Sequence, residues 1–228
     1  SLRLDPPGDA SLRFVVADGG STDGTQRIVD RLVAEHDDVA FLDNPQRLQS
    51  AAVNLAVERF GAEADFVLRC DAHANYPAGF ARQLLETQAA TGADSVVVPM
   101  DSVGSTCFQR AVAWVSDTLV GSGGSAHRGG RESGFVDHGH HALMRVGRFR
   151  QVGGYEESFS HNEDAEFDCR LRALGGTIFL DSDTRLEYHP RASFARLWRQ
   201  YFGYGKGRSR TVRRHPASLR LRQFAVPG

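Results

Sequence analysis

Apolar and polar positions alternate along the chain with two different periods, one typical of strands and one typical of helices. Short apolar runs predict strands at Leu12–Ala17, Val39–Leu42, Asp65–Arg69, Ser95–Pro99 and Thr177–Leu180. Apolar residues at helical spacing predict helices around Ile28–Val33 and over 48–60, 77–91, 165–174 and 192–204. Strands that alternate with helices predict an α/β fold with a mostly parallel sheet covered by helices. Ligands of such sheets bind at the carboxyl ends of the strands.

Two segments lack a clear period. Residues 121–134 are rich in glycine and serine and predict a loop, which a strand at Gly134–Leu143 follows. The chain beyond Gly205 is basic and poorly patterned. We therefore expect one domain over residues 1–204 and a basic C-terminal tail over 205–228.

Composition is that of a globular protein. Of the 228 residues, 41% are hydrophobic and 24% charged, which excludes wholesale disorder and fits one soluble domain. No run approaches the roughly 18–20 apolar residues that cross a bilayer. Cys70, Cys107 and Cys169 are too far apart for a metal knuckle and too few for a disulfide framework. A reducing, cytoplasmic compartment is therefore expected.

The net charge of −1 conceals a strong asymmetry. Residues 185–222 hold 11 basic side chains and a single acidic one, Glu187. Such a stretch can bind phosphates, nucleic acid or anionic lipid, and the alternative is a solvated helical surface. With the aromatic residues beside it, it predicts contact with an anionic membrane surface. The residues expected to make this contact are Arg208, Arg210, Arg213, Arg214, Trp198, Tyr201, Phe202 and Tyr204.

Asp71 and His73 follow a predicted strand at a spacing that allows both side chains to face the same way. Carboxylate and imidazole suit a divalent cation such as Mn²⁺ or Mg²⁺. Taken alone, an Asp-x-His spacing in a loop usually has no function. The pair becomes informative only together with other acidic clusters.

Two further acidic clusters lie at predicted helix starts. Glu163 and Asp164 would stabilise the helix by its dipole, or supply a carboxylate general base near a metal. The turn of residues 18–25, DGGSTDGT, is an ordinary strand-to-helix turn or a nucleotide site in which Asp18 accepts hydrogen bonds from a base or ribose. The three clusters together are far more specific than any one.

In this order, VVADGGSTDGT, RCDAH and NEDAEFDCRLRALGG resemble glycosyltransferase family 2, which has the GT-A fold. Together with NPQRLQSAAVNLAV, FVDHGHHALMR and GGYEESFSHNEDAEFD they are similar to the succinoglycan-type exopolysaccharide glucosyltransferases, over about residues 12–210. The resemblance implies a Rossmann-like, mostly parallel sheet. The family's first strand and its Pro-x-x-Asn-Glu loop have no match in residues 1–11, so the fold is expected to lack that strand and domain 1–204 to be incomplete at its N-terminus.

The resemblance also assigns the donor site. It implies metal-dependent, inverting transfer of a hexose, glucose from UDP-glucose, with Asp18 at the base and Arg47 at the base or diphosphate. Asp71 and His73 match the metal motif, in which His replaces the last Asp, as it does in transferases that make protein-linked GalNAc. A later histidine completes the site in those enzymes. His189 is the candidate here, and His138 and His140 are its rivals.

By the same resemblance, Asp164 matches the catalytic base and Glu163 assists it or contacts the acceptor. The Gln-x-x-Arg-Trp motif of processive relatives is absent, which predicts non-processive transfer. The acceptor is expected to be a saccharide, either free or lipid-linked, at the inner face of the plasma membrane. The alternatives are a sugar nucleotidyltransferase, which should carry a basic Gly-rich phosphate loop, and a non-catalytic module that binds anions or nucleic acid through its basic segment.

Overall fold

The computed structural model describes residues 10–72, 74–116, 118, 132–140 and 143–219. The strands are β1 (Phe14–Asp18), β2 (Val39–Asp43), β3 (Phe66–Leu68), β4 (Ala74–Asn75), β5 (Ser95–Val97), β6 (Met100–Ser102), β7 (Gly134–Phe135), β8 (Leu143–Arg145), β9 (Ile178–Leu180) and β10 (Leu186–Tyr188). The helices are α1 (Thr25–Glu35), α2 (Gln49–Phe60), α3 (Phe80–Thr91), α4 (Cys107–Ser116), α6 (Val146–Val152), α7 (Glu163–Ala173) and α8 (Phe194–Arg214), and a 3-10 turn (Pro216–Ser218) follows α8. Strands alternate with helices through the first half of the chain, so the expected α/β fold is confirmed.

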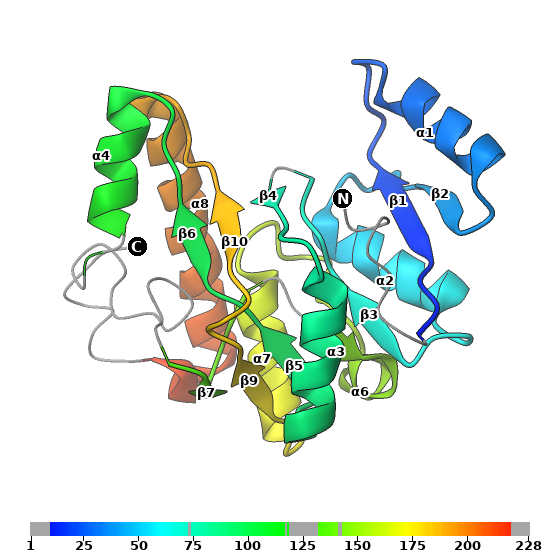
Figure 1. Cartoon of the computed structure of the whole chain (residues 1–228). Coiled ribbons are helices and arrows are strands. Elements are labelled where there is room, and N and C mark those ends of the chain that lie inside the picture. Colours follow the sequence, from blue (N-terminus) through cyan, green and yellow to red (C-terminus); the bar gives the residue numbers. More distant parts are fainter. Residues whose placement is uncertain (1–9, 73, 117, 119–131, 141–142, 220–228) are drawn as a thin grey trace.

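A five-stranded sheet with the order β3-β8-β5-β9-β7 forms the centre of the molecule (Figure 1). β3, β5 and β9 run in one direction, because β8 is antiparallel to both β3 and β5, and β5 is parallel to β9. β7 adds an antiparallel edge. The sheet is therefore mixed. β8 follows a segment without a helix among its described residues, and an antiparallel strand needs no helical crossover.

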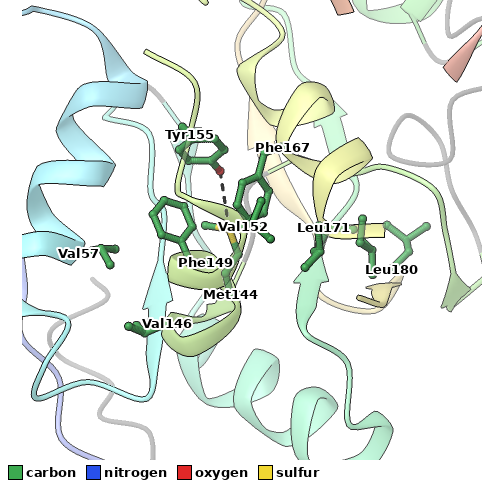
Figure 2. Close-up of a cluster of buried hydrophobic side chains, with 11 residues drawn as sticks. Val57, Met144, Val146, Phe149, Val152, Tyr155, Phe167, Leu171 and Leu180 are labelled. Carbon is green, nitrogen blue, oxygen red and sulfur yellow. Dashed lines mark hydrogen bonds between the residues drawn. The ribbon is translucent and has the colours of Figure 1, made fainter. Parts of the chain in front are cut away.

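The two faces of this sheet carry separate cores, because successive side chains of a strand point to opposite faces. Val96 and Leu143 belong to the core that includes Phe80 and Leu84 of α3. Val97 and Met144 belong to the core built on α6 and α7, which Figure 2 shows. Its centre is three aromatic rings, Phe149, Tyr155 and Phe167, with centroids 5.1–5.4 Å apart. This aromatic cluster lies against the start of α7, which carries the acidic cluster.

β1 and β2 form a parallel pair of their own, in which Asp18 is opposite Asp43. Among the described residues neither strand hydrogen-bonds to the five-stranded sheet, and β3 pairs only with β8. The pair is held to the rest of the chain by α2, which packs against β1.

A three-stranded sheet, β4-β10-β6, lies beside the central sheet (Figure 1). β10 is antiparallel to β4 and pairs Tyr188 with Ala74. On its other side β10 is parallel to β6. This arrangement places His189, the residue after β10, beside the strand that follows the Asp71 loop.

Two expectations about segments are corrected. Gly134–Leu143 is not one strand: β7 ends at Phe135 and β8 begins at Leu143, and the described residues between them, 136–140, belong to no strand. The basic segment after Gly205 is not an unpatterned tail, because α8 continues without interruption to Arg214. The boundary expected between 204 and 205 therefore falls within a helix. The expected loop at 121–134 lies outside the described residues except for its last three positions.

Candidate active site

Two of the three acidic clusters follow strands, and the third opens a helix. Asp18 is the last residue of β1, Asp71 follows β3, and Glu163 and Asp164 open α7. The loop after β2 contacts the first cluster, and the first residue of α2, which follows this loop, contacts the second. Asn44 donates its backbone N–H to the carbonyl of Asp18, and Gln49 hydrogen-bonds to the carboxylate of Asp71.

The Asp18 carboxylate organises the glycine-rich turn that follows β1. It accepts backbone hydrogen bonds from Gly20 and Ser21 at 3.0 and 2.9 Å, one from the Gln26 amide at 2.9 Å, and one from the Ser21 hydroxyl. The side-chain bonds from Ser21 and Gln26 lower the pKa of Asp18 to about 2. Asp18 is therefore ionised at neutral pH, and its carboxylate stabilises the turn through these hydrogen bonds.

Arg47 lies over the same turn. Its backbone is in the left-handed region, with φ of 56°, and its N–H donates to the Asn44 carbonyl. A Cβ at Gly19 would lie 3.3 Å from Arg47 Cα, and one at Gly20 would lie 3.4 Å from its Nη2. The glycines thus allow the guanidinium to approach the turn, and the side chain stays exposed to solvent.

The Asp71 carboxylate is buried and surrounded by donors. Oδ1 accepts from Gln49 and lies 3.5 Å from Arg69 Nε, and Oδ2 lies 3.7 Å from His140 Nε2. The backbone N–H of Asp71 donates to the Tyr76 hydroxyl at 2.6 Å. The loop is therefore fixed from both sides.

His189 is exposed at the end of β10. Its Nδ1 contacts the carbonyl oxygen of Val103 at 3.1 Å, and its Nε2 is 3.5 Å from the amide nitrogen of Asn75. His73, the other expected metal ligand, lies outside the described residues. It immediately precedes Ala74, whose strand partner, Tyr188, immediately precedes His189.

Asp164 is the best-defined group of the site. Its Oδ2 accepts a 2.6 Å hydrogen bond from His140 Nδ1, and its Oδ1 accepts one from the N–H of Ala165. Burial alone would raise the pKa of Asp164, but the hydrogen bond and the charge of His140 outweigh it and hold the pKa well below the ordinary 3.8. Asp164 is thus a carboxylate at neutral pH, able to accept a proton.

His140 connects two of the acidic clusters. One ring nitrogen bonds Asp164 and the other faces Asp71. Burial would lower the pKa of His140, but its bonds to Asp164 and Asp71 raise it to about 9. The sequence named His140 only as a rival metal ligand, and its bond to Asp164 was not expected. His138, the second rival, is bound instead to Asp168 at 2.6 Å.

Arg69 is a member of the site that the sequence reading missed. Its side chain is 3% exposed, and its guanidinium lies 3.5 Å from Asp71 and 3.4 Å from Glu163. It stands 5.7 Å from the ring centroid of Tyr155. As the last residue of an apolar run, Arg69 looked like a strand end, and only its polarity there hinted at a buried partner. Its charge offsets the repulsion between the carboxylates around it.

Glu163 differs from its neighbour. It is buried and ion-paired with Arg69. Burial and the nearby charge of Asp164 raise the pKa of Glu163 above its ordinary 4.5. The pKa of Glu163 is thus raised while that of Asp164 is lowered. Such a difference between adjacent carboxyl groups is typical of groups with different roles in a reaction.

The chain before Asp164 is seated on α8. Asn162 has φ of 67° and donates its side-chain amide to Thr211 Oγ1 at 2.7 Å. A Cβ at Gly207 would lie 2.4 Å from the carbonyl oxygen of His161, and one at Gly203 would lie 2.7 Å from the His161 ring. The small residues of α8 therefore let the helix approach the turn that begins α7.

The donor groups fit a divalent cation in part. Asp71 and His189 are of the types that Mn²⁺ and Mg²⁺ accept, and they lie on adjoining segments. Among the described residues no three His, Cys, Asp or Glu side chains form a cluster able to hold a metal. A complete set would need His73, or the approach of His140 to Asp71.

Comparison with known proteins agrees with this geometry. The profile described as "Glycosyl transferase family 2" matches residues 8–153, more than half of the chain. The chain belongs to glycosyl transferase family 2. It is similar to the succinoglycan biosynthesis protein ExoA of Rhizobium meliloti (strain 1021), with 53% identity over 212 residues. The match covers 93% of this chain, which spans 64% of the length of that relative. Family membership favours a glycosyltransferase over the two alternative hypotheses.

Solved structures share the fold at low identity. The mannosyltransferase PcManGT from Pyrobaculum calidifontis, in complex with GDP-Man and Mn²⁺, superimposes with a TM-score of 0.67 at 16% identity, over 95% of this chain and 63% of that one. GalNAc-T7 with UDP, GalNAc and Mn²⁺ gives 0.59 at 11% identity, over 79% and 38%. TarS 1–349 of S. aureus with UDP gives 0.53 at 13% identity, over 93% and 67%. These likenesses establish the GT-A type of fold.

Proposed function

We propose that the chain carries the catalytic domain of an inverting, metal-dependent hexosyltransferase of exopolysaccharide synthesis, with UDP-glucose as donor. The observation that carries the proposal is the position of Asp164 at the start of α7, where it bonds to His140, which also faces Asp71. A general base is thereby linked to the loop proposed to bind the donor diphosphate. The similarity to a succinoglycan biosynthesis protein supports this class of product.

The donor nucleotide is proposed to bind across the ends of β1 and β3. Asp18 shapes the turn and lies where the base or ribose would bind, and the exposed Arg47 above the turn can reach the base or the diphosphate. Asp71 closes the site on the other side. The start of α2 follows the loop that carries Arg47 and has no side-chain cap, and the N-terminus of a helix favours a negatively charged ligand.

Mn²⁺ or Mg²⁺ is proposed to be held by Asp71, His73 and His189. His140 is the alternative third ligand, since its Nε2 faces Asp71, and this nitrogen would lose its proton on binding the metal. A cation bound there would neutralise charge on the departing diphosphate. Alanine variants of His189 and His140 distinguish the two, because only loss of a true ligand weakens Mn²⁺-dependent UDP binding while UDP binding without metal is unchanged.

Asp164 is proposed to take the proton of the acceptor hydroxyl as that oxygen attacks C1 on the face opposite the diphosphate. The C1–O bond to the diphosphate breaks as the new bond forms, and the anomeric configuration inverts. A single displacement requires no covalent intermediate with the protein, which agrees with a base rather than a nucleophile at this position. Glu163, less acidic and beside Arg69, is proposed to bind the acceptor.

The acceptor is proposed to be a growing saccharide on a lipid carrier at the cytoplasmic face of the plasma membrane. No helix among the described residues has the length and apolar character to cross a membrane. The charge of the 185–222 segment supports this location.

Calorimetry of UDP binding with and without Mn²⁺, followed by turnover of a panel of nucleotide sugars with lipid extracts, tests the proposal. We expect Mn²⁺-dependent binding of UDP and release of UDP from UDP-glucose in preference to GDP-mannose. Failure to bind UDP in the presence of Mn²⁺ and Mg²⁺, or a preference for a guanine nucleotide, would overturn the assigned donor.

A further inference from the structure

One face of α8 carries large aromatic side chains that are exposed among the described residues. Phe194, Trp198 and Phe202 are spaced four residues apart and are 69%, 65% and 68% exposed. The first two rings stack with centroids 6.3 Å apart. Because the spacing is close to one helical turn, the three form a continuous stripe along the helix. An exposed apolar stripe of this size usually marks an interaction surface.

Cations line the same side of the helix. At about 100° per residue, Arg199, Lys206 and Arg213 fall along one edge of the aromatic stripe. All three are exposed, and α8 contains no acidic residue. The surface therefore combines aromatic rings with positive charge, and no acidic side chain of α8 neutralises that charge.

Three further arginines of α8 bond to the rest of the protein, and Arg196 is exposed. Arg208 donates to the carbonyl of Ser218. Arg210 donates to the carbonyl of Ser158, and Arg214 pairs with Glu156 at 2.7 Å. The sequence predicted that four arginines of this segment face a membrane. Three of them bond to the protein instead, and of the four only Arg213 lies on the aromatic side of α8.

We infer that the aromatic and cationic face of α8 docks on the surface of an anionic lipid bilayer. We define this docking face as Phe194, Trp198, Phe202, Arg199, Lys206 and Arg213. Aromatic rings enter the interface between headgroups and acyl chains, while cations beside them are attracted to anionic headgroups. A helix with such a face lies in the plane of the membrane. A second copy of this chain would present the same positive charge and would be repelled. Charge complementarity therefore favours an anionic lipid surface as the partner of the docking face.

The opposite face of α8 connects docking with the active site. Gly207 and Thr211 receive His161 and Asn162, which immediately precede Glu163 and Asp164. A docked α8 would hold the proposed base about one helix diameter, roughly 10 Å, above the bilayer. A saccharide that projects from a lipid carrier would then reach Asp164 without leaving the membrane. The docking deepens the membrane location proposed above and rests on it, whereas donor binding is tested separately by UDP calorimetry.

Co-sedimentation of the chain with vesicles tests the inference. Vesicles of phosphatidylcholine alone are compared with vesicles containing a third phosphatidylglycerol, at low and high salt. The first variant pairs Trp198→Ser with Phe202→Ser, and the second combines Arg199→Gln, Lys206→Gln and Arg213→Gln. The matched controls lie on α1, at the other side of the molecule in Figure 1. Ile28→Ser replaces an exposed apolar residue and is the control for the aromatic variant. Arg27→Gln with Arg31→Gln removes two exposed cations and is the control for the charge variant.

We expect binding only to the anionic vesicles, weakened by salt. The aromatic variant should lose at least about tenfold in binding, and the charge variant about fivefold per cation removed. The α1 controls should bind as the parent does, and thermal unfolding of all variants should be unchanged because the altered side chains are exposed. Absence of binding at low salt, equal losses in the α1 controls, or a dimer seen by light scattering that Trp198→Ser dissociates would each overturn the inference.

Discussion

Arg69 is the buried cation that stabilises the carboxylates of the site. It lies within 3.5 Å of Asp71 and Glu163, and its buried charge allows carboxylates to stand close together near His140. Without that cation, burial would favour the neutral forms of these groups. The ionised state of Asp164 is thus a property of its neighbours as much as of its position at a helix start.

Replacement of the proposed base gives the first prediction. Asp164→Asn should lower kcat about 10²–10⁴-fold, which is the usual contribution of a general base, while UDP binding barely changes. Steady-state kinetics and calorimetry measure the two effects. Glu163→Gln serves as the adjacent comparison and should act mainly on the KM of the acceptor. Near-normal turnover of Asp164→Asn would show that the base lies elsewhere.

Asp71 gives the second prediction. Asp71→Ala should abolish Mn²⁺-dependent UDP binding and leave the far-ultraviolet circular dichroism unchanged, since the loop is also held by Tyr76. Asp183→Ala, at an exposed carboxylate far along the chain, is the control and should bind UDP normally. If the parent protein binds UDP equally well without metal, Asp71 has another role.

The sequence identified residues whose type is unusual for their position. Asp71, Asp164 and Asp18 stand where strands end or helices begin, so they could be named without a structure. Arg69 could not be named, and His140 was named only as a rival metal ligand, because their roles come from contacts with residues 94 and 24 positions further along the chain. No local pattern encodes such pairs.

At the scale of the element, α8 supports the active site. Its small residues let it approach His161 and Asn162, and Arg214 and His215 at its end bond Glu166, which is fully buried on α7. From the sequence we predicted that this helix ends at residue 204. Gly205 and Gly207, which follow, lower the helix propensity of the segment. Contact with α7 compensates for that loss, and tertiary packing decides where the helix ends.

Gly207 gives the third prediction. In Gly207→Ala the added Cβ would meet the backbone of His161, so the turn before Glu163 must move. We expect kcat to fall by at least about tenfold, since small displacements of reacting groups are costly, with UDP binding retained. Gly147→Ala, on α6 where the new Cβ meets nothing within 4 Å, is the matched control and should keep full activity. Unchanged kcat in Gly207→Ala would remove the positioning role of α8.

At the scale of the whole molecule, the alternation of strands and helices was readable from the sequence, but the sheet topology was not. β8 enters the sheet antiparallel between β3 and β5, and its three residues give no signal of direction. That the family's first strand is missing stays a prediction, and among the described residues β1 and β2 form a pair of their own. Strand order depends on long-range pairing that a local pattern does not contain.

The fourth prediction concerns acid stability. The hydrogen bond from Arg214 lowers the pKa of Glu156 from 4.5 to about 2. Because the folded state lowers this pKa, Glu156 stabilises the fold above about pH 4.5 and loses that contribution as the pH falls toward 2. Thermal unfolding between about pH 5 and 2.5 should therefore show a smaller loss of Tm in Glu156→Gln than in the parent. Parallel curves for the two proteins would contradict this assignment.

The anomeric configuration of the product tests the central claim most directly, because a base on the face opposite the diphosphate permits only inversion. UDP-glucose carries an α-linked glucose. Proton NMR of the product formed from UDP-glucose and a lipid-linked acceptor in the presence of Mn²⁺ should show the large H1–H2 coupling of a β-glucoside. The small coupling of an α-glucoside would contradict the proposed role of Asp164.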